Sequence, residues 1–165
     1  MVTTTALEAE LLALAGSVPD PELPVLTLAE LGVVREVRMT ALHRVEVDLT
    51  PTYTGCPAIE AMSADIERVL HDHGIPEVEV RTVLSPPWST DAITAEGRRK
   101  LTEFGIAPPR PTGPADGPVT VDLTIRCPHC GSTDTTLLSR FSSTACKALR
   151  RCESCREPFD HFKEL

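Results

Sequence analysis

Apolar and polar positions along the first 107 residues recur with two different periods, which predict helices and strands. Leucines recur at helical spacing from Leu7 to Leu14, and Gly16 is expected to end this helix. Charged and apolar side chains alternate in two neighbouring segments, and the few residues between them favour a hairpin. The predicted elements are, in chain order, a helix over 7–16, a helical turn over 27–31, strands over 33–39 and 45–49, a helix over 57–73, a strand over 78–83 and a helix over 95–104. Strands flanked by helices in this order predict an α+β domain with one small mixed sheet, whose strand order the pattern does not give.

Residues 108–118 contain five prolines and two glycines, a composition that cannot sustain a helix or a central strand. This run predicts a semi-stiff linker between a domain over residues 1–107 and a tail over residues 119–165. A tail of about 47 residues seldom buries enough apolar surface to fold without help, so it is expected to need an additional stabilising link such as a bound metal ion. Its predicted strands, over 119–125, 135–138, 148–151 and 159–162, have the arrangement of a zinc ribbon.

Four of the six cysteines form two C-x-x-C pairs, Cys127 with Cys130 and Cys152 with Cys155, separated by 21 residues. Two-residue spacing lets both sulfurs of a tight turn reach one ion at about 2.3 Å. We therefore predict one closed, structural zinc site, with iron as the alternative metal for four thiolates. Two unrelated dithiols, or a disulfide-oxidant site at the first pair, remain as competing interpretations. Cys146 lies close to the second pair, either as a small buried residue or as a spare ligand.

The charge balance bears on the partners that the chain could bind. It has 16 basic and 24 acidic side chains, a net charge of -8. Neither half has the basic surface that phosphate backbones select, so no nucleic acid is expected as a partner. No apolar run of about 20 residues predicts a membrane span. The N-terminal segment contains Glu8 and Glu10 without a basic residue, unlike a secretory signal, so we expect a cytoplasmic protein.

A second group of candidate residues lies in three short segments of the first domain. Cys56 precedes Pro57 at the start of a predicted helix, where an N-cap position would make the thiol more acidic and more nucleophilic. The alternative for Cys56 is a half-buried residue that fills a turn. Asp20 and Glu22 form an acidic elbow around a proline, which is typical of a solvated turn. Trp88 follows two prolines after the third strand, as a core residue or as part of a loop.

These segments, P-D-P-E, T-G-C-P and S-P-P-W-S-T-D in this order, resemble the iron–sulfur carrier and assembly domain family. The tail sequence F-S-S-T-A-C-K-A-L-R-R-C-E-S-C-R-E-P-F-D-H-F-K resembles the D subunits of phenylacetyl-CoA epoxidase systems. The resemblance extends from about residue 6 to the C-terminus, and the linker is its least specific part. It implies an accessory, non-catalytic subunit that assists assembly of an iron–sulfur or di-iron centre in the oxygenase or the reductase of that system.

The resemblance also implies roles for individual residues. The Cys56 thiolate would transiently hold iron or a cluster, Asp20 and Glu22 would lie near it, and Trp88 and Asp91 would shape the same edge. A cluster usually needs four ligands. One thiolate therefore implies either a homodimer that shares Cys56 or a bridge to the client's cysteines. The tail would then be a docking module for the client subunit.

Two other functions compete with this interpretation. One is a structural or rubredoxin-like electron-transfer subunit of the same complex, with iron in the tail and an inert Cys56. The other is an independent hydrolase or thiol enzyme that uses Cys56. The latter is disfavoured because His71 and His73 lie at the far end of the same predicted helix, about 25 Å away at 1.5 Å per residue.

Overall fold

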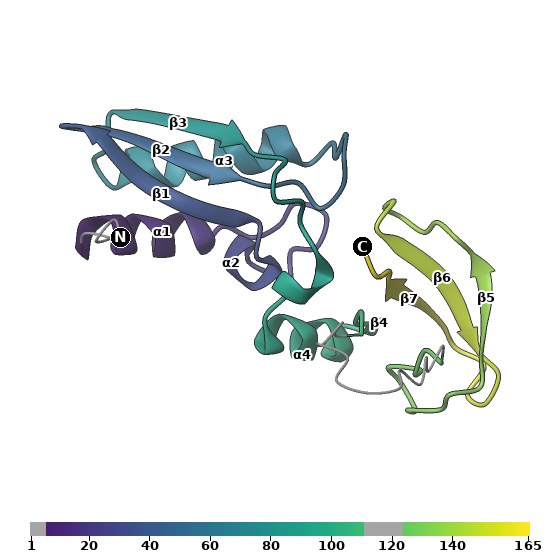
Figure 1. The fold of residues 1–165 in the computed structure, drawn as a ribbon. Helices are drawn as coiled ribbons and strands as arrows, with labels where there is room; N and C mark the ends of the chain where they lie inside the picture. The colour runs from purple at the N-terminus through teal and green to yellow at the C-terminus, as the bar shows by residue number, and fades with distance from the viewer. Residues whose placement is uncertain (1–5, 111–123) are drawn as a thin grey trace, which may run out of the picture. The chain divides into compact units, whose positions relative to one another are not determined.

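The computed structural model describes residues 6–110 and 124–165, and the chain forms two compact units, residues 1–97 and 98–165 (Figure 1). The elements assigned to the first unit are α1 (Ala6–Gly16), α2 (Leu28–Leu31), β1 (Val34–Ala41), β2 (Arg44–Leu49), α3 (Ile59–Asp72), β3 (Glu77–Thr82), the 3-10 turn η1 (Thr90–Ala92) and the beginning of α4 (Ala95–Glu103). Among the described residues, no helix combines the length and the apolar character needed to span a membrane.

The sheet of unit 1 has the strand order β1-β2-β3, with β1 antiparallel and β3 parallel to β2. Helices α1 and α3 pack on β1 and β3 and on each other, so they cover one face of this sheet (Figure 1). Val45 and Val47 of β2 are fully buried toward this side. On α3, Met62, Ile66 and Leu70 follow at four-residue spacing and are buried as one stripe. The predicted α+β class with a small mixed sheet is confirmed.

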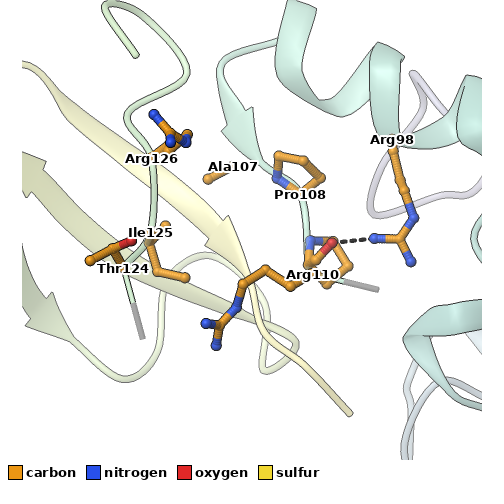
Figure 2. A pocket seen from close by; sticks show the side chains of 8 residues that line it. Arg98, Ala107, Pro108, Arg110, Thr124, Ile125 and Arg126 are labelled. Atoms are coloured by element: carbon orange, nitrogen blue, oxygen red, sulfur yellow. Dashed lines mark hydrogen bonds between the residues drawn. The ribbon is translucent and has the colours of Figure 1, made fainter. Parts of the chain in front are cut away.

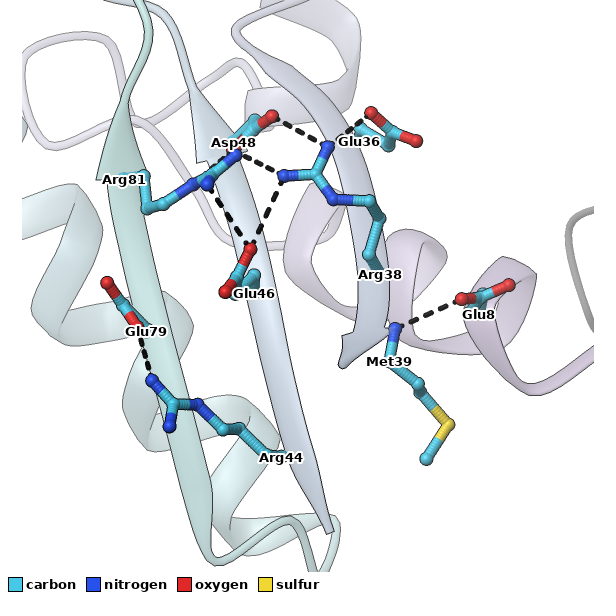
Figure 3. A network of polar contacts seen from close by, with 9 residues as sticks. All are labelled: Glu8, Glu36, Arg38, Met39, Arg44, Glu46, Asp48, Glu79 and Arg81. Atoms are coloured by element: carbon cyan, nitrogen blue, oxygen red, sulfur yellow. Dashed lines mark hydrogen bonds and ion pairs between the residues drawn. The ribbon is translucent and has the colours of Figure 1, made fainter. Parts of the chain in front are cut away.

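Charged side chains of the sheet form one network, centred on Asp48 of β2 (Figure 3). Asp48 is only 8% exposed, and its carboxylate pairs with Arg38 of β1 at 3.0 Å and with Arg81 of β3 at 2.8 Å. Glu46 lies 3.5 Å from Arg38 and 3.3 Å from Arg81. Burial by itself would raise the pKa of Asp48, but the hydrogen bonds and charges of the two guanidinium groups outweigh it and lower that pKa. The network therefore ties all three strands together across their outer side chains.

We predict that Asp48→Asn lowers the free energy of unfolding of unit 1 by about 1–3 kcal/mol, because two charge-assisted hydrogen-bond partners lose their acceptor. The folded-state pKa of Asp48 lies below its unfolded value of about 3.9, so this stabilisation is present above about pH 4 and is lost as the pH falls through the folded-state pKa. Urea unfolding followed by the fluorescence of Trp88, the single tryptophan, measures both effects.

The matched control is Glu79→Gln, which removes the exposed Arg44–Glu79 pair of the same sheet. An exposed pair contributes between about 0 and 1 kcal/mol, so this variant should be close to wild type. Equal losses in the two variants, or a loss in Asp48→Asn that persists unchanged at pH 2.5, would contradict the assignment.

The described strands of unit 2 are β4 (Ile106–Ala107), β5 (Thr135–Ser139), β6 (Lys147–Cys152) and β7 (Pro158–Phe162). They form one sheet in the order β4-β7-β6-β5, in which β4 is parallel to β7 and the other pairs are antiparallel. The last three strands correspond to the predicted ribbon strands. One buried apolar cluster of unit 2 consists of Ala107, Ile125, Cys127, Cys152 and Phe159.

The two units divide after Gly97, ten residues before the expected end of the first domain. The reason is the short strand β4, because Ile106 pairs with Asp160 and Ala107 with His161 of β7. A two-residue strand has no sequence signature of its own, so it was not predicted. Residues 111–118 of the expected linker and 119–123 of the expected strand over 119–125 lie outside the described residues, and residues 124 and 125 are not in a strand.

Candidate metal centre and candidate cysteine site

Two tight turns present the four cysteines of the C-x-x-C pairs. In the first, the N–H of Gly131 donates to the carbonyl of Cys127 at 2.9 Å, and Gly131 has a φ of 76°. In the second, the N–H of Arg156 donates to the carbonyl of Cys152 at 3.0 Å, and Arg156 has a φ of 69°. Although the second turn has an arginine where the first has a glycine, both turns have a left-handed residue at this position and the same hydrogen bond.

The four sulfur atoms lie within 4.8 Å of one another. The Sγ atoms of Cys127 and Cys155 are 3.8 Å apart, and those of Cys130 and Cys152 are 3.5 Å apart. A tetrahedral ion with sulfur ligands at about 2.3 Å has edges of about 3.8 Å, so this donor set fits one such ion. Cys127 and Cys152 are buried in the apolar cluster of unit 2, while Cys130 is exposed. The group therefore has the character of a structural metal-binding site, in which two of the four cysteines, Cys127 and Cys152, are also core residues.

Hydrogen bonds to sulfur favour the ionised form of one of the four cysteines. The backbone N–H of Cys155 donates to the Sγ of Cys152 at 3.4 Å, and with further contacts it lowers the pKa of Cys152 to about 6. The N–H of Glu157 favours the thiolate of Cys155, but burial and the three neighbouring thiols prevail and raise the pKa of Cys155 to about 12. Four adjacent sulfurs cannot all be ionised without a positive charge, which a divalent ion supplies.

Cys146 is buried but lies outside this group of four among the described residues. Its Sγ is 3.1 Å from the hydroxyl oxygen of Thr144. This position agrees with the packing role that the sequence left open and does not add a fifth sulfur to the cluster.

We predict that Cys127→Ser abolishes metal binding and unfolds the ribbon of unit 2, because structural zinc contributes roughly 10–16 kcal/mol to small modules. Metal analysis and ¹⁵N–¹H correlation spectra should show loss of the metal and of the dispersed β5–β7 resonances, with those of β1–β3 retained. Cys146→Ser, a buried cysteine outside the cluster, is the matched control and should keep its metal. A ribbon that stays folded after Cys127→Ser would contradict a structural metal.

Cys56 lies in the turn that precedes α3, and its side chain is 6% exposed. The N-cap of α3 is Ala58, so Cys56 lies near the start of this helix, two residues before the cap. Burial raises the pKa of the Cys56 thiol, and the charges of Glu22 and Asp20 raise it further, although the N–H of Ala58 and the side chain of Tyr53 act in the opposite direction. The prediction of an acidic thiol is therefore wrong, because desolvation outweighs the helix terminus.

The acidic elbow lies close enough to act on Cys56 electrostatically. Asp20 is 5% exposed, and its Oδ1 accepts hydrogen bonds from the N–H groups of Glu22 at 2.9 Å and Leu23 at 2.7 Å. This side chain therefore fixes the turn that presents Glu22. The acidic residues thus form a rigid turn that also sets the charge around the thiol.

Trp88 is both a loop residue and a core residue, so the two alternatives from the sequence apply together. It is 5% exposed, and its indole N–H donates to the carbonyl of Leu31 at 2.9 Å. A depression of about 90 Å³ lies between its loop and residues 50–54 before Cys56. Asp91 is exposed in η1, where its N–H donates to the Ser89 hydroxyl at 3.2 Å.

Arg35 of β1 connects the same two loops and was not singled out from the sequence. Its Nε donates to the hydroxyl of buried Thr50 at 3.1 Å, and its terminal nitrogen donates to the carbonyl of Pro86 at 3.3 Å. The partners lie 15 and 51 residues away along the chain, so no local pattern signals this contact.

We predict that iodoacetamide alkylates Cys56 more slowly in the folded chain than in urea at pH 7.5, because the raised pKa and burial both reduce the reactive thiolate. The folded-state rate should still be rising at pH 9, above the ordinary thiol pKa of about 8.5. Peptide mapping by mass spectrometry identifies the modified residue, and Cys56→Ser is the control. A rate that reaches its plateau below pH 8 would indicate the acidic thiol that the structure argues against.

Both parts of the chain match known families. The family described as iron–sulfur cluster assembly protein matches residues 8–85, and the PaaD zinc beta ribbon domain matches residues 111–163. A protein of Escherichia coli strain K12, provisionally named as the D subunit of 1,2-phenylacetyl-CoA epoxidase, is 47% identical over 156 residues, which cover 93% of this chain and 91% of that protein.

Two further similarities cover about half of the chain. The Fe-S protein maturation auxiliary factor SufT of Staphylococcus aureus strain USA300 is 36% identical over 78 residues, 46% of this chain and 85% of that protein. The crystal structure of a domain of unknown function, DUF59, from Bacillus anthracis has a TM-score of 0.53 and 29% identity, and the match covers 58% of this chain and 92% of that one.

The fold, the four-cysteine centre and these matches define a class of protein that joins an iron–sulfur cluster assembly domain to a zinc β-ribbon. Within this class, the chain belongs to the family of 1,2-phenylacetyl-CoA epoxidase D subunits. The family resemblance found in the sequence is confirmed.

Proposed function

We propose that this protein is a non-catalytic accessory subunit of a 1,2-phenylacetyl-CoA epoxidase, which assists assembly of an iron–sulfur or di-iron centre in the oxygenase or reductase of that complex. The Escherichia coli relative is named as a subunit of this epoxidase, and two relatives of unit 1, from Porphyromonas gingivalis and Staphylococcus aureus, are named Fe-S protein maturation auxiliary factors. The observation that carries the proposal is the buried thiol of Cys56, which shares its surroundings with the carboxylates of Asp20 and Glu22.

This combination suits transient binding of a cation. The negative charges that disfavour the Cys56 thiolate attract a positive ion, so iron that reaches the site displaces the thiol proton and offsets the repulsion. Once the iron leaves, burial restores the neutral thiol. The cargo is therefore held only while its charge is present, which is what a carrier requires and a permanent site does not.

A single thiolate is too few ligands for a stable cluster, because clusters usually have four. The remaining ligands come from the client's own cysteines or from Cys56 of a second copy in a homodimer. Trp88 and Asp91 shape the edge of this site, and Arg35 positions its two loops. Unit 2, stabilised by one zinc ion at its four cysteines, serves as the docking module for the client subunit.

We predict that Cys56→Ala lowers the iron content and the epoxidase activity of the co-expressed complex several-fold while leaving the accessory protein folded. The thiol is buried but small, and the change removes one ligand and little packing. Iron per complex, acid-labile sulfide and turnover are measured against Cys146→Ala, the matched substitution of a buried cysteine outside both sites. Unchanged iron content in Cys56→Ala would remove Cys56 from the mechanism.

The competing function, a rubredoxin-like electron-transfer subunit, has one observation in its favour. Hydrogen bonds from backbone N–H groups to the sulfurs, such as that from Cys155 to Cys152, tune the potentials of iron–thiolate sites. Protein purified without oxygen distinguishes the two functions by its metal content and colour. One zinc per chain and a colourless ribbon support the accessory role, whereas a red, reducible iron site supports electron transfer.

A further inference from the structure

Unit 2 contains a pocket of about 310 Å³ that the four-cysteine centre and Cys56 do not explain (Figure 2). It is lined by Arg98, Ala107, Pro108, Pro109, Arg110, Thr124, Ile125 and Arg126. The volume lies at the lower end of the range of ligand sites, about 300–1,000 Å³. At the roughly 30 Å³ that a water molecule occupies in the liquid, it has room for about ten non-hydrogen atoms.

The interior of this pocket is apolar, and the charged side chains among its described lining residues are arginines. Ala107, Pro109 and Ile125 are buried, and Figure 2 shows the side chains of three arginines around this apolar centre. Among the described residues that line it, none carries a carboxylate. An organic molecule that combines an apolar body with a negative charge matches this lining.

Two of the arginines are held in place by the protein. Arg98 donates to the carbonyl of Pro109, and the Nε of Arg110 donates to the carboxylate of Glu164 at 3.1 Å. The guanidinium of Arg110 therefore already pairs with one carboxylate of the protein. Fixed donors cost less conformational entropy when a ligand binds.

Arg126 differs from the other two because it is exposed and makes a weak bond, at 3.4 Å, to the carbonyl of Gly131. A guanidinium has five N–H donors and recognises a carboxylate in a bidentate manner. Next to an apolar surface the pair is less screened by water than at an open surface. Substitution of Arg126 should therefore weaken the binding of an anion most and disturb the fold least.

We propose that this pocket binds a small organic carboxylate, with its apolar body against Ala107, Pro109 and Ile125 and its carboxylate paired with Arg126. The inference rests on the pocket lining and stands whether or not Cys56 carries iron. Hexanoate, with eight non-hydrogen atoms, matches the volume and serves as the probe.

The test is a titration of the full-length, zinc-loaded chain with sodium hexanoate, followed by ¹⁵N–¹H correlation spectra. Saturable shifts at the amides of Ala107, Ile125 and Arg126 are expected. Hexan-1-ol, which lacks the charge, and acetate, which lacks the apolar body, should each bind at least about tenfold more weakly, the loss expected for one charge-assisted hydrogen bond or two buried methylene groups.

Arg126→Ala should weaken hexanoate binding at least about fivefold, and Arg126→Glu should abolish it. Arg140→Ala removes an exposed arginine that does not line the pocket, so it changes the net charge equally and should bind like wild type. Metal content is measured for every variant because Arg126 adjoins Cys127. Absence of saturable shifts, equal binding of hexan-1-ol, or equal loss in Arg140→Ala would overturn the proposal.

Discussion

The constraint on which unit 2 depends is the grouping of four cysteine sulfurs that fit one cation, because two of these cysteines, Cys127 and Cys152, also belong to its apolar core. Cys127 and Cys152 are buried with Phe159 and Ile125, so the ligand turns cannot separate without opening the core. In turn, four adjacent sulfurs cannot be ionised together unless a positive charge lies between them. Metal binding and packing are therefore one event in this part of the chain, as expected for a unit too small to fold on apolar burial alone.

Unit 1 holds a thiol and two carboxylates near one another, although a thiolate and two carboxylates would repel each other. Burial keeps Cys56 neutral, and the turn around Asp20 fixes the acidic elbow through backbone hydrogen bonds. The charge network of Asp48, Arg38 and Arg81 joins the three strands of the sheet, and the turn with Cys56 follows one of them, β2. Under the proposed function this setting would receive a cation, while the four-cysteine centre lies in the other unit.

Most helices and strands could be predicted because their signals are local. The stripe of Met62, Ile66 and Leu70 on α3 and the alternation around Val45 and Val47 on β2 repeat with the periods of a helix and a strand. The four-cysteine cluster could be predicted equally well, because two-residue spacing already places a pair of sulfurs on one turn. The strand β4 was missed, since two residues carry no period and its existence depends on pairing with β7 more than fifty residues later.

The sequence by itself identified the family and predicted a two-part organisation and the four-cysteine cluster, because spacing, composition and short motifs are properties of neighbouring residues. Only the tertiary structure decided that the Cys56 thiol is less acidic than usual, that Trp88 is buried while part of a loop, and that Arg35 connects two distant loops. It also decided that arginines at positions 98, 110 and 126 surround one apolar pocket. Desolvation and long-range contacts depend on which segments surround a residue, and that information exists only once the chain has folded.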